Sequence, residues 1–107
     1  MIEVTLPLHL VSGANVREHW ALRSKRAKSH REACIAVPGH PVPCVVTLTR
    51  LGPRELDSDN LAISAKHVRD GIADRLGVND NDKRVEWRYA QERSKEYGVR
   101  IVIQGAG

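Results

Sequence analysis

The chain has 107 residues and a mass of 11.9 kDa, which is enough for one domain with one modest core. Apolar residues make up 41% and charged residues 28%, values that are ordinary for a globular protein and exclude a disordered chain or a fibre. The longest uncharged stretch, Ala33 to Thr49, contains three prolines, so we expect no membrane span and a cytoplasmic protein. Two cysteines are too few for a disulfide framework.

The first elements in the chain are a strand, a long helix and a second strand. Alternating apolar residues predict a strand over 2–8. The span 16–37 lacks Gly and Pro and is rich in Ala, Arg, Lys and Glu, which predicts a helix that ends at Pro38-Gly39. A run of Val and Leu predicts a second strand over 45–51, followed by Gly52-Pro53.

An apolar stripe predicts a second helix over 56–76. Its members recur at spacings of three and four, and Gly77 supplies the C-cap; they are Leu61, Ala65, Val68, Ile72 and Leu76. Alternation then predicts strands over 85–90 and 97–103, with a turn at 93–96.

These elements predict the fold class. We expect a single α+β domain over residues 1–107, with a small mixed β-sheet and two helices on one face of it. The order is strand, helix, strand, helix, strand, strand. Only four residues are aromatic and none is Phe, so the core is thin and a homodimer is favoured.

The charge changes sign along the chain. Residues 1–50 carry seven basic and three acidic side chains, and residues 83–107 carry six and three. Residues 54–82 carry four and seven. A basic surface around an acidic centre suits a protein that attracts a polyanion and holds cations at that centre. The alternative is a mixed charged surface with ordinary helix-end acids.

Carboxylates gather at both ends of the second predicted helix. Asp57 and Asp59 precede it, and Asp80 and Asp82 follow Gly77. Two carboxylates two residues apart can converge on one Mg²⁺, which prefers oxygen ligands. The alternative is that one Asp caps the helix and the other complements its dipole. Neither pair has the Gly and Glu spacing of an EF-hand, which excludes that calcium loop.

Lys66 is the candidate cation beside these carboxylates. It follows Asp59 by seven residues, about 10 Å along a straight helix. Its ammonium could bind a scissile phosphate or stabilise charge in a phosphoryl transition state. The alternative is a surface ion pair between Lys66 and Asp70, four residues further on.

A zinc site is a weaker candidate. Four side chains with zinc-binding chemistry occur within a short span: His30, Cys34, His40 and Cys44. Three prolines interrupt that span and a basic helix runs through it, so a preformed site is not expected.

Three segments with fixed spacings resemble the signature of RusA-family Holliday junction resolvases, especially the short, phage-type members. They read Asp57-Ser-Asp-Asn-Leu, then Lys66-x-x-Arg-Asp-Gly-Ile-Ala-Asp-x-Leu-Gly-Val, then Asn79-Asp-x-Asp82. Ser12-x-x-Asn15-x-Arg17-Glu is similar to that family's N-terminal motif. The resemblance implies a homodimeric, Mg²⁺-dependent endonuclease that cuts four-way DNA junctions symmetrically, with Mn²⁺ as a possible substitute. It also implies a bacterial or phage-encoded protein of DNA recombination and repair.

The resemblance implies a role for each matching residue. Asp57 and Asp59 match the acidic pair, Lys66 the essential lysine and Asp80 the carboxylate after the helix, and these four form the implied catalytic set. Asp70 matches a supporting aspartate. The implied metal ligands are the three acidic residues of this set and a second carboxylate in the loop after the helix: Asp57, Asp59, Asp80 and Asp82.

Two positions depart from the family pattern. In the shorter family version the lysine follows the second aspartate by about one turn, where this chain has Ile63. We therefore take Lys66 as the equivalent after a three-residue insertion. The motif after the helix is usually an Asp pair, and its first member here is Asn79. This leaves open whether Asp80 or Asp82 is the ligand, and it permits a branched-DNA-binding module of the same fold without cleavage.

Basic side chains, most of them on the first predicted helix, would contact DNA phosphates and supply affinity with little sequence information. The predicted DNA-binding residues are Asn15, Arg17, Arg23, Lys25, Arg26, Lys28, Arg31 and Arg69.

Overall fold

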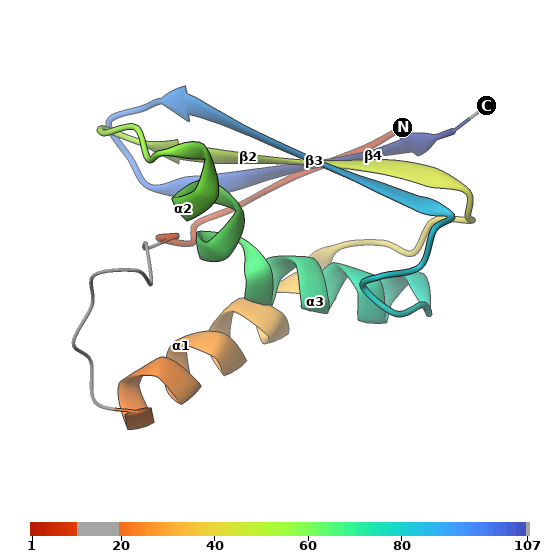
Figure 1. The fold of residues 1–107 in the computed structure, drawn as a ribbon, viewed down its shortest axis with the longest axis horizontal. Coiled ribbons are helices and arrows are strands. Elements are labelled where there is room, and N and C mark those ends of the chain that lie inside the picture. The colour runs from red at the N-terminus through yellow and green to blue at the C-terminus, as the bar shows by residue number, and fades with distance from the viewer. Residues whose placement is uncertain (11–19, 107) are drawn as a thin grey trace.

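A computed structural model describes residues 1–10 and 20–106 of the chain, and within them four strands form one mixed sheet with three helices on one face (Figure 1). The strands are β1 (Ile2–Leu6), β2 (Cys44–Gly52), β3 (Val85–Arg93) and β4 (Gly98–Gly105). The helices are α1 (Trp20–Ala33), α2 (Ser58–Ser64) and α3 (Lys66–Leu76). A short 3₁₀ turn, Cys34–Ala36, follows α1. The predicted α+β class and the single mixed sheet are confirmed.

The strand order is β1-β4-β2-β3, with β4 antiparallel to both of its neighbours. The strands β2 and β3 are parallel. Two parallel neighbours need a long crossover connection, and here the chain through α2 and α3 supplies it. This topology leaves β3 at the edge of the sheet, next to the helices that precede it in the chain.

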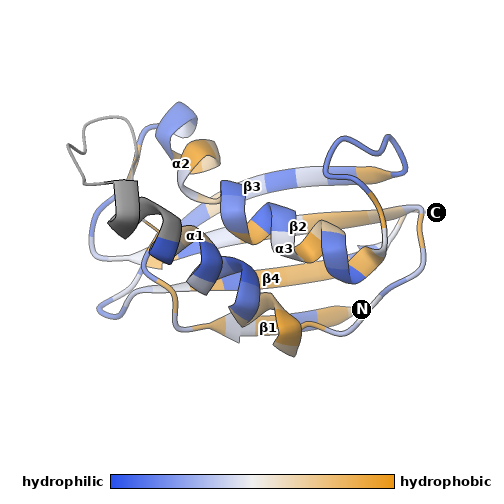
Figure 2. Ribbon diagram, turned by 90° about the horizontal axis from the view of Figure 1, so that it is seen from below, coloured by the Kyte–Doolittle hydropathy of each residue, from blue (hydrophilic) through white to orange (hydrophobic). Residues whose placement is uncertain are grey.

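The core lies between the sheet and the helices. Successive residues of a strand point to opposite faces, and most of the residues that face the helices are apolar. On the two central strands these side chains are completely or almost completely buried: Val46, Leu48, Val99, Ile101 and Ile103. Val68 and Ile72 of α3 pack onto them, and Figure 2, seen from the helix side, shows α1 and α3 lying over the strands.

The second predicted helix is two helices, and the prediction of one continuous helix is wrong. Ala65 lies between α2 and α3 with φ −93° and ψ 0°. The hydroxyl of Ser64 donates to the carbonyl of Leu61 at 2.7 Å, so it competes with the backbone ladder at this turn. The apolar stripe is nevertheless as predicted, because all of its residues except the last are buried. Gly77 caps α3 in the left-handed conformation with φ 73°, as expected.

The end of α1 approaches α3 at a glycine. A Cβ atom on Gly71 would lie 2.9 Å from Sγ of Cys34 and 3.1 Å from the carbonyl oxygen of Arg31. Gly71 is therefore the residue that permits this close helix contact. None of the helices described is long and apolar enough to cross a membrane.

Candidate nuclease site

The predicted acidic pair lies at the start of α2. Asp57 is the N-cap residue, and its carbonyl accepts the first helical hydrogen bond from the amide of Leu61 at 2.8 Å. Its carboxylate makes no capping hydrogen bond. Asp59 lies in the first turn, and both carboxylates are exposed without a hydrogen bond or ion pair to any residue described. The structure thus does not use the Asp57 side chain as a helix cap.

The loop that leads into Asp57 is held by two side chains from the sheet. The amide of Leu56 donates to Oε1 of Gln91 at 2.8 Å, and Nε2 of Gln91 donates back to the carbonyl of Leu56 at 2.7 Å. Arg50 donates through Nη1 to the carbonyl of Arg54. Arg50 and Gln91 are paired neighbours on β2 and β3. The loop is therefore tied to the sheet at two points just before the acidic pair.

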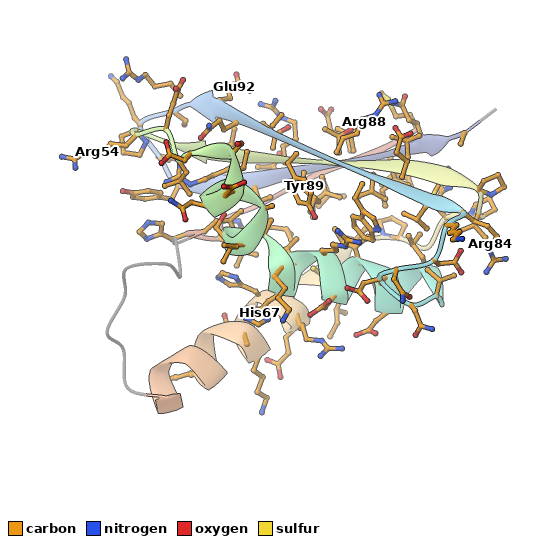
Figure 3. All side chains as sticks on the ribbon, viewed as in Figure 1. Arg54, His67, Arg84, Arg88, Tyr89 and Glu92 are labelled. Carbon is orange, nitrogen blue, oxygen red and sulfur yellow. The ribbon has the colours of Figure 1, made fainter. Side chains whose placement is uncertain are left out.

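Asp80 lies in the loop after α3 and is held there by Arg69. Nη2 of Arg69 donates to the carbonyl of Asp80 at 2.6 Å, and Nη1 donates to the hydroxyl of Tyr89 at 2.9 Å. The guanidinium carbon lies 4.8 Å from the centroid of the Trp87 ring. Figure 3 shows Tyr89 pointing from β3 toward the helices. Arg69 thus joins the Asp80 loop to β3, and its side chain is turned inward, although it was predicted to bind DNA.

Asp82 is bound to Arg84. Its two carboxylate oxygens accept from Nε and Nη2 of Arg84 at 3.0 and 2.8 Å, and one of them also accepts from the backbone amide of Arg84 at 2.9 Å. The side-chain hydrogen bonds, followed by the backbone hydrogen bond, lower the pKa of Asp82 to about 2. This carboxylate is already occupied, so Asp80 is the loop carboxylate that stays available.

Lys66 is the first residue of α3 and is exposed. It forms no ion pair with Asp70 or with any other residue that the structure describes. The surface pair that was the alternative for Lys66 is therefore not formed. The break at Ala65 puts Asp59 and Lys66 on separate helices, so the separation expected for a straight helix does not apply.

Asp70 and Asp80 share a small hollow beside α3. Its volume is about 160 Å³, and Asp74 and Arg31 also line it. Arg31 donates to the carboxylate of Asp74 at 2.8 Å, which joins α1 to α3. Neither Asp70 nor the Asp80 carboxylate forms a hydrogen bond or salt bridge within the described parts of the chain, although Asp74, helped by the charge of Asp70, raises the pKa of Arg31.

The structure does not gather all the predicted ligands in one place. Asp57 and Asp59 share a turn, whereas Asp82 is paired with Arg84 at the opposite end of the sheet from Arg54 (Figure 3). Within residues 1–10 and 20–106, no group of three His, Cys, Asp or Glu side chains could hold a metal ion. The four possible zinc ligands also do not form such a group among the described residues, and two of them are the buried free cysteines Cys34 and Cys44.

The basic residues predicted to bind DNA have different surroundings. On α1, Lys25 is exposed, and Lys28 is exposed with its ammonium 3.9 Å from the carboxylate of Glu32. Arg31 is paired with Asp74. The remaining four lie outside what the structure describes, either as whole residues or as side chains on α1: Asn15, Arg17, Arg23 and Arg26.

The sequence did not point to Gln91 and Arg50, although both hold the loop before Asp57. A signal for Gln91 does exist. The alternation that begins at Val85 puts Gln91 on the same face as Trp87 and Tyr89, and a polar residue on a face that packs against helices requires a hydrogen-bond partner. Comparison with protein families and with curated proteins finds no match to this chain, so the resemblance rests on the sequence motifs alone.

Proposed function

We propose that the protein is a Mg²⁺-dependent endodeoxyribonuclease that resolves four-way DNA junctions by symmetric phosphodiester hydrolysis. The observation that carries this proposal is the state of Asp57 and Asp59. Both carboxylates are exposed in one turn and unpaired among the described residues, and Asp57 does not cap its helix. They stand at the head of the motif that resembles the RusA family.

The side chains present fit the cation. Mg²⁺ takes hard oxygen ligands and keeps several waters, so it binds through one or two carboxylates with substrate phosphate completing its shell. Asp57 and Asp59 would hold it. Asp80 follows α3, two residues before Asp82, and does not join them in this structure, so the cation has two protein carboxylates here. Mg²⁺, or Mn²⁺ in its place, would supply the Lewis-acid chemistry that phosphodiester hydrolysis needs.

The exposed lysines have matching tasks in this proposal. Lys66, exposed and free of acidic partners in the described structure, stabilises the negative charge that develops on the phosphate. Lys25 and Lys28 are exposed on α1 and contact backbone phosphates. A homodimer would present two such sites, which suits two symmetric cuts.

Binding of branched DNA without cleavage is the second candidate function. The observation that favours it is the separate anchoring of the acidic residues. The Asp57 loop is bound to Gln91, whereas the Asp80 loop is bound through Arg69 to Tyr89. Cleavage requires these loops to serve one phosphate, while binding does not.

Single-turnover cleavage of a synthetic four-way junction, with Mg²⁺ or with EDTA, tests the proposal. Asp59→Asn removes a charged ligand and keeps the shape, so products should vanish while the junction still shifts on a gel. Glu86→Gln makes the same charge change on the sheet face opposite the helices and should cut at the wild-type rate. Lys66→Ala should slow cleavage on the order of 100-fold with nearly unchanged affinity.

The outcomes separate the two candidate functions. Wild-type cleavage by Asp59→Asn would remove the acidic pair from the reaction. Junction binding without any product from the wild-type protein in Mg²⁺ or Mn²⁺ would favour the binding module.

A further inference from the structure

Gln91 makes an unusual pair of contacts for a strand side chain. Its amide accepts from the backbone N–H of Leu56 and donates to the carbonyl of the same residue, at 2.8 and 2.7 Å. These are the two hydrogen bonds that a residue of a neighbouring strand would make. Both polar backbone groups of Leu56 are thus held, and the next residue in the chain is Asp57.

Arg50 reinforces this attachment from the neighbouring strand. It is 5% exposed and faces the helix side of β2, opposite Gln91 in the register. Its guanidinium donates to the carbonyls of Arg54 and Leu10, the latter at 3.3 Å. The loop is therefore bound at Arg54 and again at Leu56.

A fixed point also follows the acidic pair. Leu61 is 6% exposed, and its amide donates to the carbonyl of Asp57. The chain is therefore held by Gln91 on one side of Asp57 and by buried packing on the other. Two carboxylates bind one cation best when their spacing is fixed before the cation arrives, and these two attachments restrain the backbone on both sides of Asp57.

We propose that Gln91 is a positioning residue that fixes the Asp57 and Asp59 carboxylates for a divalent cation. This inference rests on the proposed function for the choice of cation. Groups that orient metal ligands are worth about 10- to 100-fold in metal affinity or activity. Gln91 touches neither carboxylate, so it acts through the backbone of Leu56 alone.

The test uses Gln91→Met in the full chain. Methionine has nearly the same length and volume as glutamine, but it has no hydrogen-bond donor and its sulfur is only a weak acceptor. The amide hydrogen of Leu56 should exchange faster with solvent, as measured by NMR. The dissociation constant for Mn²⁺, measured from the free-ion EPR signal, should rise about 10- to 100-fold. Arg50→Met is less suitable, because the buried position of Arg50 makes a folding defect the expected result.

Two further variants test whether the reach of the Gln91 amide matters, and whether any Gln-to-Met change in a strand has the same effect. Gln91→Asn keeps the amide but is one methylene shorter, so it cannot reach both groups of Leu56 and should also weaken Mn²⁺ binding. It serves as the second variant if the methionine variant does not fold. Gln104→Met makes the same change on an exposed residue of β4 and should leave Mn²⁺ affinity and Leu56 exchange unchanged.

The readouts distinguish a failure of this inference from a failure of the proposed function. Wild-type Mn²⁺ affinity in both Gln91 variants, or an unchanged Leu56 exchange rate, would overturn the positioning role. So would a wild-type protein that binds no Mn²⁺. Mn²⁺ binding that weakens in the Gln91 variants, in a protein that cuts no junction, would support the positioning role and refute the nuclease.

Discussion

Replacing Arg69 should destabilise the folded protein, because its guanidinium is part of the packing between α3, β3 and the Asp80 loop. Arg69→Met keeps most of the apolar stem and removes the hydrogen bonds to Tyr89 and Asp80 together with the contact to the Trp87 ring. Hydrogen bonds from a charged donor contribute about 1.5–3 kcal/mol each when buried. The bond to Asp80 is exposed and therefore weaker.

The contributions can be combined into an expected loss. We take about 1.5 kcal/mol for the part-buried bond to Tyr89 and about 0.5 kcal/mol for the exposed bond to Asp80. The guanidinium above the Trp87 ring adds about 0.5–1 kcal/mol. The free energy of unfolding should thus fall by about 2–3 kcal/mol, since solvent replaces part of what is lost.

Urea unfolding followed by circular dichroism measures this loss. With a urea dependence of about 1–1.5 kcal/mol per molar for a small domain, the midpoint should fall by about 1.3–3 M with an unchanged slope. Lys66→Met is the matched control. Lys66 is exposed and unpaired in the described structure, so its replacement should change stability by less than about 0.5 kcal/mol.

The same variant tests the prediction that Arg69 binds DNA. Removing a residue that contacts a phosphate reduces the slope of log binding constant against log salt concentration by about one unit. If Arg69 points inward and does not contact DNA, the folded Arg69→Met variant should have the same slope as the wild-type protein. A stability loss below about 1 kcal/mol, together with a reduced salt slope, would refute the reasoning from the structure.

Two further predictions concern an ion pair and a helix contact. Arg84 lowers the pKa of Asp82 to about 2, so the pair stabilises the folded state above about pH 4 and this contribution is lost as the pH falls toward 2. In Arg84→Met the pKa of Asp82, followed by NMR, should return toward about 4, and a value still near 2 would contradict the assignment. Gly71→Ala should destabilise the fold by about 1–3 kcal/mol, because the new methyl group would lie 2.9 Å from Sγ of Cys34. Cys34→Ala should recover part of that loss in a double-mutant cycle of urea midpoints, and a Gly71→Ala midpoint at or above wild type would show that the helices have room.

The elements were predictable because their patterns are local. Both the apolar stripe of the second predicted helix and the alternation that starts at Val85 arise because one face of the element is buried. The burial of these residues in the structure agrees with that pattern. The break at Ala65 could not be predicted in the same way. No Gly or Pro marks it, and the Ser64 hydroxyl that bonds to the Leu61 carbonyl at this turn is a feature that unbroken helices also show.

The directions of individual polar side chains were also beyond the sequence. Arg69 follows a buried residue on the helix, and periodicity places it beside the apolar stripe without deciding whether its long side chain turns inward. Gln91 bonds to a backbone 35 residues away in the chain. That contact depends on the parallel register of β2 and β3, which only the folded sheet defines.

The position of β4 has a consequence for how the protein is made. It is the last strand of the sheet in chain order, yet it lies between β1 and β2 and pairs with both. On the ribosome, β1 therefore has no strand to pair with until β4 has emerged from the exit tunnel. Completion of the sheet therefore waits for β4, and nascent chains that stall before Gly98 would expose the apolar faces of β1 and β2 to chaperones and proteases.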